Sequence, residues 1–328
     1  MKVRRYTSEL DDTKKWFLEE MENNGYDYLT IKSYENFLYR IRDFEINYMN
    51  DKKINEFNYD EIILFLKILG SSSIDSLSNY VCMISIYFDF CKKESKMDNV
   101  IDYIRAISLE TLEKCVNKDK FNNRFISRET LYTLVDKLIN EYDKAILLLT
   151  FEGIMGKGYS ELINLKVSDL DFECNIIKLS NREVAINDKL KFILKRLVHQ
   201  DTIFYANEID NRVNELNMDS PYLFKPTNRY ISLKSTQKRI EQGKYNPYQI
   251  DSKVLNNRIF KILKEFIRAP YLTMNNIYRS GLIEQIKKNI GEENITKQTF
   301  ADEITKISDY SLGTGYKIYQ NYISSNVF

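Results

Sequence analysis

The sequence predicts a mainly α-helical protein of two domains with one small β-hairpin. Its 328 residues exceed the usual size of a single domain. Only 4 prolines and 10 glycines interrupt the chain, so few sharp loops are expected. Apolar and aromatic residues recur at three-to-four spacing through most of both halves, and this is the period of a buried helix face.

Residues 8–110 predict four helices that form a compact bundle. The first, "SELDDTKKWFLEEMENNG", has Ser8 as its N-cap, acidic residues in its first turn, and ends at Gly25. The third, "NYDEIILFLKILG", has Asn58 as its cap. The second and fourth helices carry apolar faces at helical spacing, which comprise Ile31, Tyr34, Phe37, Leu38, Ile41 and Phe44, and Leu77, Tyr80, Val81, Ile84, Tyr87 and Phe88.

The polar, basic stretch "TLEKCVNKDKFNNRFIS" interrupts the helical period and predicts an interdomain linker. We therefore expect a first domain at 1–112, a linker at 113–126 and a second domain at 127–328. In the second domain, "SRETLYTLVDKLINEYDKAILLLTFEGI" predicts helix. The stretch "IIKLSNREVAIN" alternates apolar and polar residues around the turn "LSN", which predicts a β-hairpin. The rest is expected to be helical apart from a basic, irregular region near 225–250.

Charge is unevenly distributed along the chain, although the net charge is only +1. Residues 223–279 hold 12 basic and 3 acidic residues, a net charge of +9 over one segment. Such a concentration is typical of a surface that binds a polyanion, but it can also be a solvated surface that acidic residues elsewhere balance.

Composition argues against several other classes of protein. No run of about 18 apolar residues could span a membrane, and the basic N-terminus "MKVRRYTSELDD" lacks the apolar core of a secretory signal. The four cysteines, Cys82, Cys91, Cys115 and Cys174, lie in apolar segments without a CxxC pair, and His199 is the single histidine. We therefore expect reduced thiols, no metal site and no cofactor in a cytoplasmic protein.

Motifs spread over residues 8–325 occur in an order that a known family shares. The segments from "LTIKSYENFLYRIRDF" to "SLSNYVCMISIYFDFCKK" resemble the N-terminal core-binding domain of tyrosine recombinases, or phage integrases. "FISRETLYTLVDKL" and "SELINLKVSDLD" resemble the opening of their catalytic domain, and "YRSGL" and "YKIYQNYI" their arginine box and nucleophile segment. The resemblance implies a tyrosine-recombinase-like fold, with a helical (SAM-like) core-binding domain and an α-rich, integrase catalytic-type domain that carries a small β-hairpin or sheet.

In that family, a tyrosine attacks a DNA phosphate, two arginines stabilise the developing charge, and a lysine and histidines manage protons. The position of the first arginine is Gly158 in "MGKGYSEL", and the adjacent Lys157 lacks the planar fork of an arginine. The hairpin that would present the lysine is short and leaves Arg182 as its basic candidate. The second arginine is retained as Arg279.

The remaining catalytic positions have also changed. Asn276 and Asp309 stand at the positions of the two histidines, so neither supplies an imidazole. Tyr319 aligns with the nucleophile, with Tyr322 as an alternative, and Asn321 stands where a final His or Trp is expected. The resemblance therefore implies a catalytically degenerate site, that of a pseudoenzyme.

DNA binding can persist after cleavage is lost. Arg279, with Asn276 one turn earlier on the same helix face, can donate to a backbone oxygen of DNA, or it can pair with Glu284 or an acidic residue of the linker. Lys157 can bind a phosphate or simply end a helix, and the serines near residue 73 can face DNA or only cap the fourth helix. The expected DNA-binding residues are Lys157, Tyr159, Arg182, Lys225, Arg229, Asn276 and Arg279 in the second domain, and Lys32, Ser33, Arg40, Ser73, Ser76 and Asn79 in the first.

We expect a sequence-specific DNA-binding protein whose two domains close around the duplex without cutting it. The sequence looks most like the integrase-like master repressors of SPβ-type temperate phages, which implies a transcriptional repressor that maintains lysogeny in a prophage. The expected partners are double-stranded operator DNA and a protein antirepressor or regulator, at the nucleoid of a bacterial host. The alternative is a tyrosine recombinase, either active with Lys157 replacing the lost arginine or an accessory factor in integration and excision.

Overall fold

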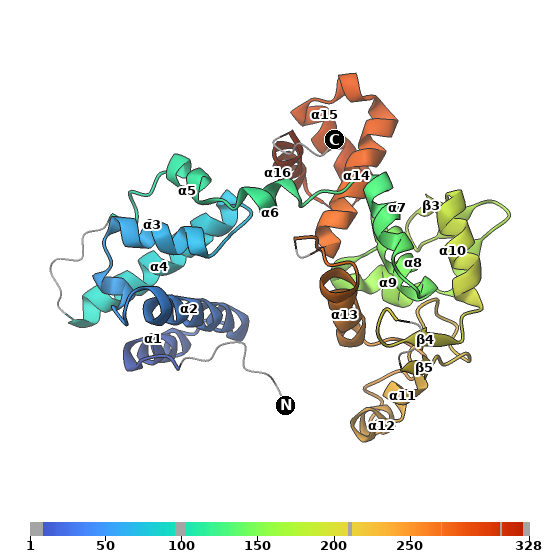
Figure 1. Ribbon diagram of the computed structural model, residues 1–328, viewed down its shortest axis with the longest axis horizontal. Coiled ribbons are helices and arrows are strands. Elements are labelled where there is room, and N and C mark those ends of the chain that lie inside the picture. The colour runs from blue at the N-terminus through green and yellow to red at the C-terminus, as the bar shows by residue number, and fades with distance from the viewer. Residues whose placement is uncertain (1–8, 96–102, 209–211, 270, 309, 324–328) are drawn as a thin grey trace. The chain divides into compact units, whose positions relative to one another are not determined.

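The computed structural model describes residues 9–95, 103–208, 212–269, 271–308 and 310–323 (Figure 1). The chain divides into two compact units, Met1–Phe121 and Asn122–Phe328. Both are mainly helical, and the second also holds small antiparallel sheets, so the predicted fold class is confirmed. Among the helices of the described residues, none has the length and hydropathy that a membrane span requires.

The first unit is helical throughout its described part and has one hydrophobic core. The side chain of Asp11 caps the first helix by accepting from the Lys14 amide at 3.0 Å; the predicted cap, Ser8, lies outside the described residues. Asn58 and Glu61 form a capping box at the third helix, as the sequence predicted for Asn58. The elements are α1 (Asp12–Asn23), α2 (Tyr28–Tyr48), η1 (Ile54–Glu56), α3 (Tyr59–Ile68), α4 (Ile74–Ser95), α5 (Leu109–Cys115) and α6 (Lys118–Asn122).

The boundary between the two units falls inside the linker expected at 113–126, but this stretch is partly helical. It contains the end of α5 and all of α6, and α5 packs against α3 and α4. Leu112 and Cys115 are buried in the first core. Two buried residues are enough to dock a short helix, but they give too few repeats for a hydrophobic period to be visible among charged neighbours.

The second unit is built around α8, a helix that is buried on nearly every side. All of its residues except Lys144 are buried, and it contacts α7, α10 and α14. The helical elements of this unit are α7 (Arg128–Asp136), α8 (Glu141–Phe151), η2 (Lys157–Tyr159), α9 (Ser160–Asn164), η3 (Val167–Asp169), α10 (Asp188–Val198), α11 (Asn228–Ile231), α12 (Lys234–Glu241), α13 (Ser252–Lys261), η4 (Ile262–Phe266), α14 (Met274–Ile290), η5 (Glu292–Asn294), α15 (Lys297–Ile307) and α16 (Leu312–Ile323).

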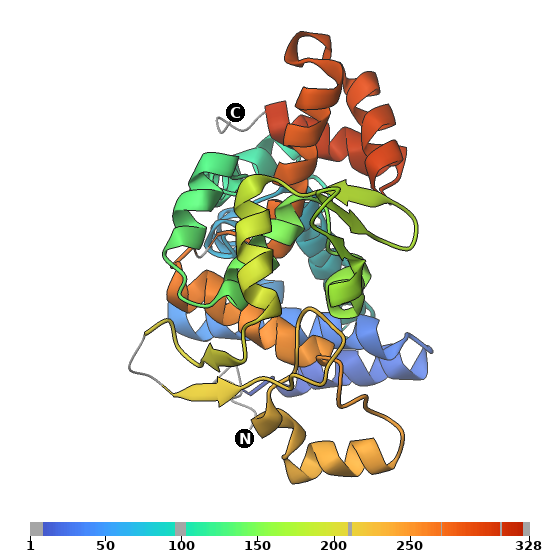
Figure 2. The same ribbon diagram turned by 90° about the vertical axis from the view of Figure 1, so that its right-hand side faces the viewer.

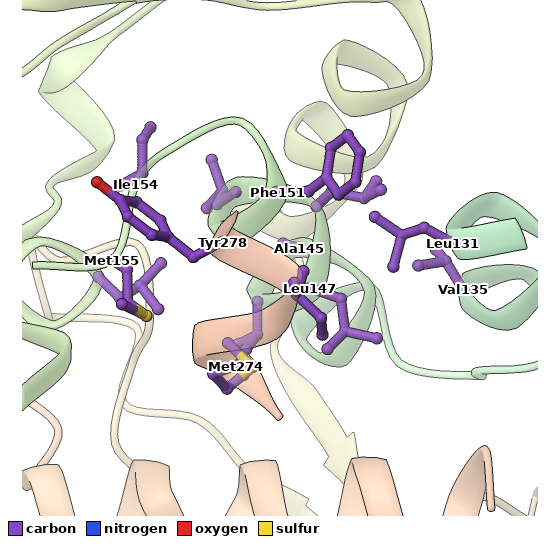
Figure 3. Packing of buried hydrophobic residues seen from close by; sticks show 14 of the residues in the cluster. Leu131, Val135, Ala145, Leu147, Phe151, Ile154, Met155, Met274 and Tyr278 are labelled. Carbon is purple, nitrogen blue, oxygen red and sulfur yellow. The ribbon is translucent and has the colours of Figure 1, made fainter. Parts of the chain in front are cut away.

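Figure 3 shows how side chains of α7, α8 and α14 meet in this core. Leu131 and Val135 of α7 lie on one side of Phe151, and Tyr278 of α14 lies on the other. The closest approach is made at Gly281 of α14, where an added β-carbon would lie 1.6 Å from the Phe151 carbonyl oxygen. The two helices therefore touch through their backbones.

The strands form two small antiparallel sheets. Strands β1 (Leu170–Asp171), β2 (Ile176–Lys178) and β3 (Glu183–Ala185) pair in the order β1-β2-β3. The register Ile177↔Val184 belongs to the hairpin that the sequence predicted, which is confirmed. Strands β4 (Thr202–Phe204) and β5 (Val213–Glu215) form a second pair that the sequence analysis did not predict.

Two other sequence-based expectations need correction. The stretch predicted as one helix forms two helices, α7 and α8, which residues 137–140 separate. The Asn140 side chain accepts from the Phe204 amide at 2.9 Å, and this tertiary contact holds the break between them. The region near 225–250, predicted to be irregular, contains α11 and α12. These two helices lie at the end of the second unit opposite to α15 and α16, as both views show (Figures 1 and 2).

Candidate nucleic-acid interface

The position that corresponds to the first arginine lies in a turn with a left-handed backbone. Gly156, Gly158 and Tyr159 have φ values of 68°, 63° and 67°. A β-carbon at Gly156 would lie 2.4 Å from the Ser160 side chain, and any L-residue at position 158 would be strained by its backbone conformation. An arginine at position 158 would therefore carry about 1–2 kcal/mol of backbone strain. Lys157 is exposed between the two glycines.

Arg182 is held by the protein itself. Its Nη1 and Nη2 atoms donate to the Glu161 carboxylate at 2.6 and 3.0 Å, and Nη2 also donates to the Gly153 carbonyl at 2.7 Å. Glu161 in turn accepts from the Met155 amide at 2.9 Å. The hairpin arginine thus fixes the neighbouring turn, and this geometry does not favour its predicted contact with DNA.

Lys225 is buried, which disfavours the DNA contact that the sequence predicted for it. The side chain is 4% exposed, and its ammonium donates to the Val198 carbonyl, the last residue of α10, at 3.1 Å. Burial lowers the pKa of this lysine. A lysine that caps a helix C-terminus from inside the protein is not available to a phosphate. Arg229 on α11 is exposed and lines, with Lys225, a cavity of about 590 Å³.

Replacing Lys225 by methionine is expected to leave DNA affinity within about two-fold of the wild type, with the same salt dependence. The melting temperature should change modestly, because the lost hydrogen bond (about 0.5–1.5 kcal/mol) is offset by removal of a buried charge. Electrophoretic mobility-shift titrations at several salt concentrations and thermal melts measure both quantities. A smaller salt slope in this variant would restore Lys225 to the interface.

Arg279 lies on α14 one turn after Asn276, as the motif predicted. Thr273 caps this helix by accepting from the Asn276 amide at 3.2 Å, which leaves the Asn276 side chain partly exposed near the N-terminus. The guanidinium of Arg279 lies 5.7 Å from the centre of the Tyr310 ring. Its Nε atom is buried and has no hydrogen-bond partner within the described ranges of the chain.

Glu284 pairs with Arg128 and not with Arg279, the partner that the sequence also allowed. Glu284 accepts instead from Arg128 Nε at 2.5 Å, and Arg128 also pairs with Glu152. The positive charge of Arg279 is therefore not neutralised by the carboxylate closest to it in the helix sequence.

A second arginine, Arg124, belongs to a segment that contacts the Arg279 helix, and the sequence analysis missed it: the Ile126 amide donates to the Ser280 hydroxyl at 3.0 Å. It is 7% exposed, and its Nη2 atom donates to the Asn321 Oδ1 atom of α16 at 3.0 Å. Burial and the neighbouring positive charge of Arg279 together lower the pKa of Arg124 to about 10. No local motif marks Arg124, because its neighbours come from α14 and α16, far along the chain.

The C-terminal tyrosines pack against the protein's own core. The rings of Tyr319 and Tyr322 lie 5.5 and 6.1 Å from that of Phe300, and both residues are half-buried. Asn321, between them, faces Arg124. Asp309, assigned to the second histidine position, lies outside the described residues. This arrangement gives the C-terminal helix a packing role and connects it to the arginine pair.

In the first unit, the predicted residues of α2 are on the surface. Ser33 and Arg40 are exposed, and Lys32 pairs with Glu35. The Arg40 Nη1 atom donates to the Tyr80 hydroxyl of α4 at 2.9 Å, which joins the two helices on this face. A surface that spans α2 and α4 therefore presents a mixture of cationic and hydrogen-bonding groups.

The serines at the start of α4 mainly hold each other. The Ser73 hydroxyl donates to Ser76 Oγ at 2.9 Å and accepts from the Ser76 amide at 3.2 Å. This is the N-capping role that the sequence also allowed. Asn79, one turn later, is exposed and remains available to a ligand. In the described ranges, no three His, Cys, Asp or Glu side chains gather as a metal site would require.

Comparisons with known proteins identify related chains. Residues 10–93 match the family described as MrpR, N-terminal core-binding domain, and residues 125–326 match MrpR, C-terminal catalytic domain. A relative in Bacillus subtilis (strain 168), the SPbeta prophage-derived uncharacterized protein YopR, is 24% identical over 265 residues, which cover 80% of this chain and 78% of the relative.

Similar solved structures include two recombinases. The XerA recombinase has 17% identity and a TM-score of 0.40 over 95% of this chain and 93% of its own. The Tn1549 transposon integrase, solved in complex with a circular intermediate DNA, has 13% identity and a TM-score of 0.47 over 93% of this chain and 94% of its own.

Proposed function

Since the chain belongs to the MrpR family and has a tyrosine recombinase-like fold, we propose that it is a sequence-specific DNA-binding protein that binds the duplex without cutting it. The observation that carries this proposal is the contrast around Arg279. Arg279 is retained, and its buried Nε atom makes no hydrogen bond within the described residues, whereas Gly158 and Asn276 occupy positions that cleavage needs.

The lost groups would raise the barrier to strand cleavage considerably. An acid or base contributes about 10²–10⁴-fold and a charge-stabilising donor about 10²–10³-fold to such a rate. Losing one of each raises the barrier by about 5 kcal/mol or more, since each factor of ten is about 1.4 kcal/mol. Binding does not depend on these groups, because an arginine and an asparagine amide donate hydrogen bonds without transferring a proton.

The proposed contacts fall into two groups. In the second unit, Arg279 and Lys157 bind phosphates, which position the protein, and Asn276, Tyr159 and Arg229 add contacts nearby. In the first unit, exposed side chains on α2 and α4 read base edges or phosphates, since an α-helix fits the major groove. These are Lys32, Ser33, Arg40 and Asn79.

We further propose that the protein is a transcriptional repressor of a phage or prophage that maintains lysogeny. A protein that stays bound to an operator without breaking it blocks access to a promoter. The similarity to a prophage-derived chain supports this setting. A protein antirepressor or regulator that releases the repressor, and a place at the nucleoid in the bacterial cytoplasm, belong to the same proposal.

Genome-wide recovery of the DNA bound by the protein tests the regulatory role. The expected result is a set of repeated, promoter-proximal sites that share one sequence, together with increased transcription of the adjacent genes when the protein is removed. Recovery of a single site at a prophage end, with no effect on transcription, would contradict repression and favour the accessory recombination factor.

A second experiment separates binding from cleavage. A nicked suicide substrate that carries the bound sequence is expected to give no SDS-resistant complex with the wild-type protein. The Tyr319→Phe variant should bind the intact site with wild-type affinity, because the proposed function gives the Tyr319 hydroxyl no role. Tyr322→Phe is the matched control. A covalent complex that disappears only in Tyr319→Phe would establish the alternative, an active tyrosine recombinase.

A further inference from the structure

We propose that Arg124 and Arg279 bind one and the same phosphate of the DNA backbone, so that Arg124 supplies the second guanidinium that the chain lacks at Gly158. This inference rests on the proposed DNA-binding function and adds to it a residue that no motif marks. It also assigns helix α16 a role in binding, because Asn321 of that helix orients Arg124.

A buried hydrogen bond brings the two arginines together. The Ile126 amide donates to the Ser280 hydroxyl at 3.0 Å, and this hydroxyl donates to the Asn276 carbonyl at 2.7 Å. Ser280 is fully buried, so the contact fixes the start of the second unit against α14. Arg124 precedes Ile126 by two residues and Arg279 precedes Ser280 by one, so the anchor holds both arginines in the same neighbourhood.

Aromatic rings and an amide oxygen orient the two guanidinium groups. Arg124 lies 5.3 Å from the centre of the Phe125 ring, and its Nη2 atom donates to the Asn321 amide oxygen. Arg279 lies over the Tyr310 ring. Contacts of this kind fix the direction of a planar guanidinium.

The electrostatics of the pair favour an anion between the two groups. Burial and the positive charge of Arg279 both disfavour the charged form of Arg124, as its lowered pKa shows. The Arg279 Nε atom is a buried donor without an acceptor in the described residues, which is unfavourable unless a ligand supplies one. A phosphate offers several oxygens to two planar, fork-shaped donors and neutralises one of the two charges.

The Arg124→Met variant tests the pair, with Arg196→Met on α10 as the matched control. Arg196 is an exposed arginine that pairs with Glu141 and has no place in the proposed interface. Arg124→Met is expected to bind the recovered DNA site at least about ten-fold more weakly near 0.1 M salt, with the slope of log K against log salt smaller by about one. Arg196→Met should match the wild type. Equal affinity and slope in all three proteins would overturn the assignment.

A double variant tests whether the two arginines share a phosphate. If they do, Arg124→Met combined with Arg279→Ala should lose less affinity than the sum of the single losses, because either change already disrupts the same contact. Fully additive losses would mean two separate phosphates. Asn321→Ala provides a variant that keeps both charges: its affinity should fall while its salt slope stays unchanged.

A phosphate titration separates this inference from the proposed function. Inorganic phosphate, compared with chloride at equal ionic strength, should raise the melting temperature of the wild type and of Arg196→Met more than that of Arg124→Met. Equal shifts in all three would overturn the anion site. If the wild type bound no duplex in any assay, the proposed function would fail, and the phosphate titration alone would decide whether the arginine pair is an anion site. An unfolded Arg124→Met would be replaced by Arg124→Lys, which keeps the charge and lacks the fork.

Discussion

Gly281→Ala is expected to destabilise the second unit by about 3 kcal/mol or more. The added β-carbon would lie 1.6 Å from the Phe151 carbonyl oxygen and 2.6 Å from its carbonyl carbon. Backbone atoms cannot rotate away as a side chain can, so α14 would have to move off α8. That movement would disturb the packing of side chains such as Leu282 and Ile283, which are at most 1% exposed.

Gly313→Ala is the matched control. Gly313 lies in the first turn of α16, and no atom lies within 4 Å of the β-carbon that alanine would add. Alanine favours helix over glycine by about 1 kcal/mol, so this variant should be neutral or slightly more stable. Similar stability losses in the two variants would contradict the close approach of α8 and α14.

The single tryptophan allows the effect to be assigned to one unit. Trp16 lies in α1 and packs against Phe90, so its fluorescence follows the first unit, whereas far-ultraviolet circular dichroism follows both. In urea, Gly281→Ala should lower the midpoint of the circular dichroism transition that belongs to the second unit. The fluorescence transition should stay at its wild-type midpoint. Equal shifts of both signals would show that the two units unfold together.

The helices that the sequence predicted well are those with long, regular apolar faces. On α2, Tyr34, Phe37 and Ile41 are buried as their spacing predicted. The hairpin was found because alternation and its turn agreed. Helix α5 was missed because two buried residues give no period, and the backbone contact at Gly281 was missed because it depends on a partner, Phe151, that sequence spacing does not reveal.

The candidate site was predicted only as far as local motifs reach. Arg279 and Asn276 lie on one helix face, so their spacing was sufficient. Arg124 joins them through contacts with α14 and α16, and nothing near it in the sequence carries that information. The sequence also did not show the backbone conformation at Gly158. This backbone is left-handed, which disfavours an arginine at that position.

The net charge of segment 223–279 overestimates how basic the surface of the folded protein is. The segment 223–279 carries a net charge of +9, but several of its cations serve the fold. Lys225 caps α10, Arg258 pairs with the fully buried Asp143, and Arg239 pairs with Asp251. Charge that is used inside a domain contributes little to the field outside it, so the interface rests on fewer cations than the composition suggested.

Arg279→Ala is expected to weaken binding to the recovered DNA site by about 30-fold or more, since a charge-assisted, fork-shaped phosphate contact contributes about 2 kcal/mol or more. The slope of log K against log salt should become smaller by about one, because one fewer counterion is released. Fluorescence anisotropy of a labelled duplex at several salt concentrations measures both. The free energy of unfolding should change by less than about 1 kcal/mol, because the Nε atom has no acceptor to lose within the described part of the chain.

The Arg279→Lys variant separates the effect of the positive charge from that of the planar guanidinium. A lysine at this position keeps the positive charge and so should keep the wild-type salt slope, but it lacks the planar fork, and its affinity should lie between those of the wild type and Arg279→Ala. The same ordering is expected on unrelated DNA, because a phosphate contact carries no base information. A loss confined to the specific site would instead make Arg279 a reader of base edges. Unchanged affinity and slope in Arg279→Ala would give the arginine a role in the fold alone and would rule out a phosphate contact through its guanidinium.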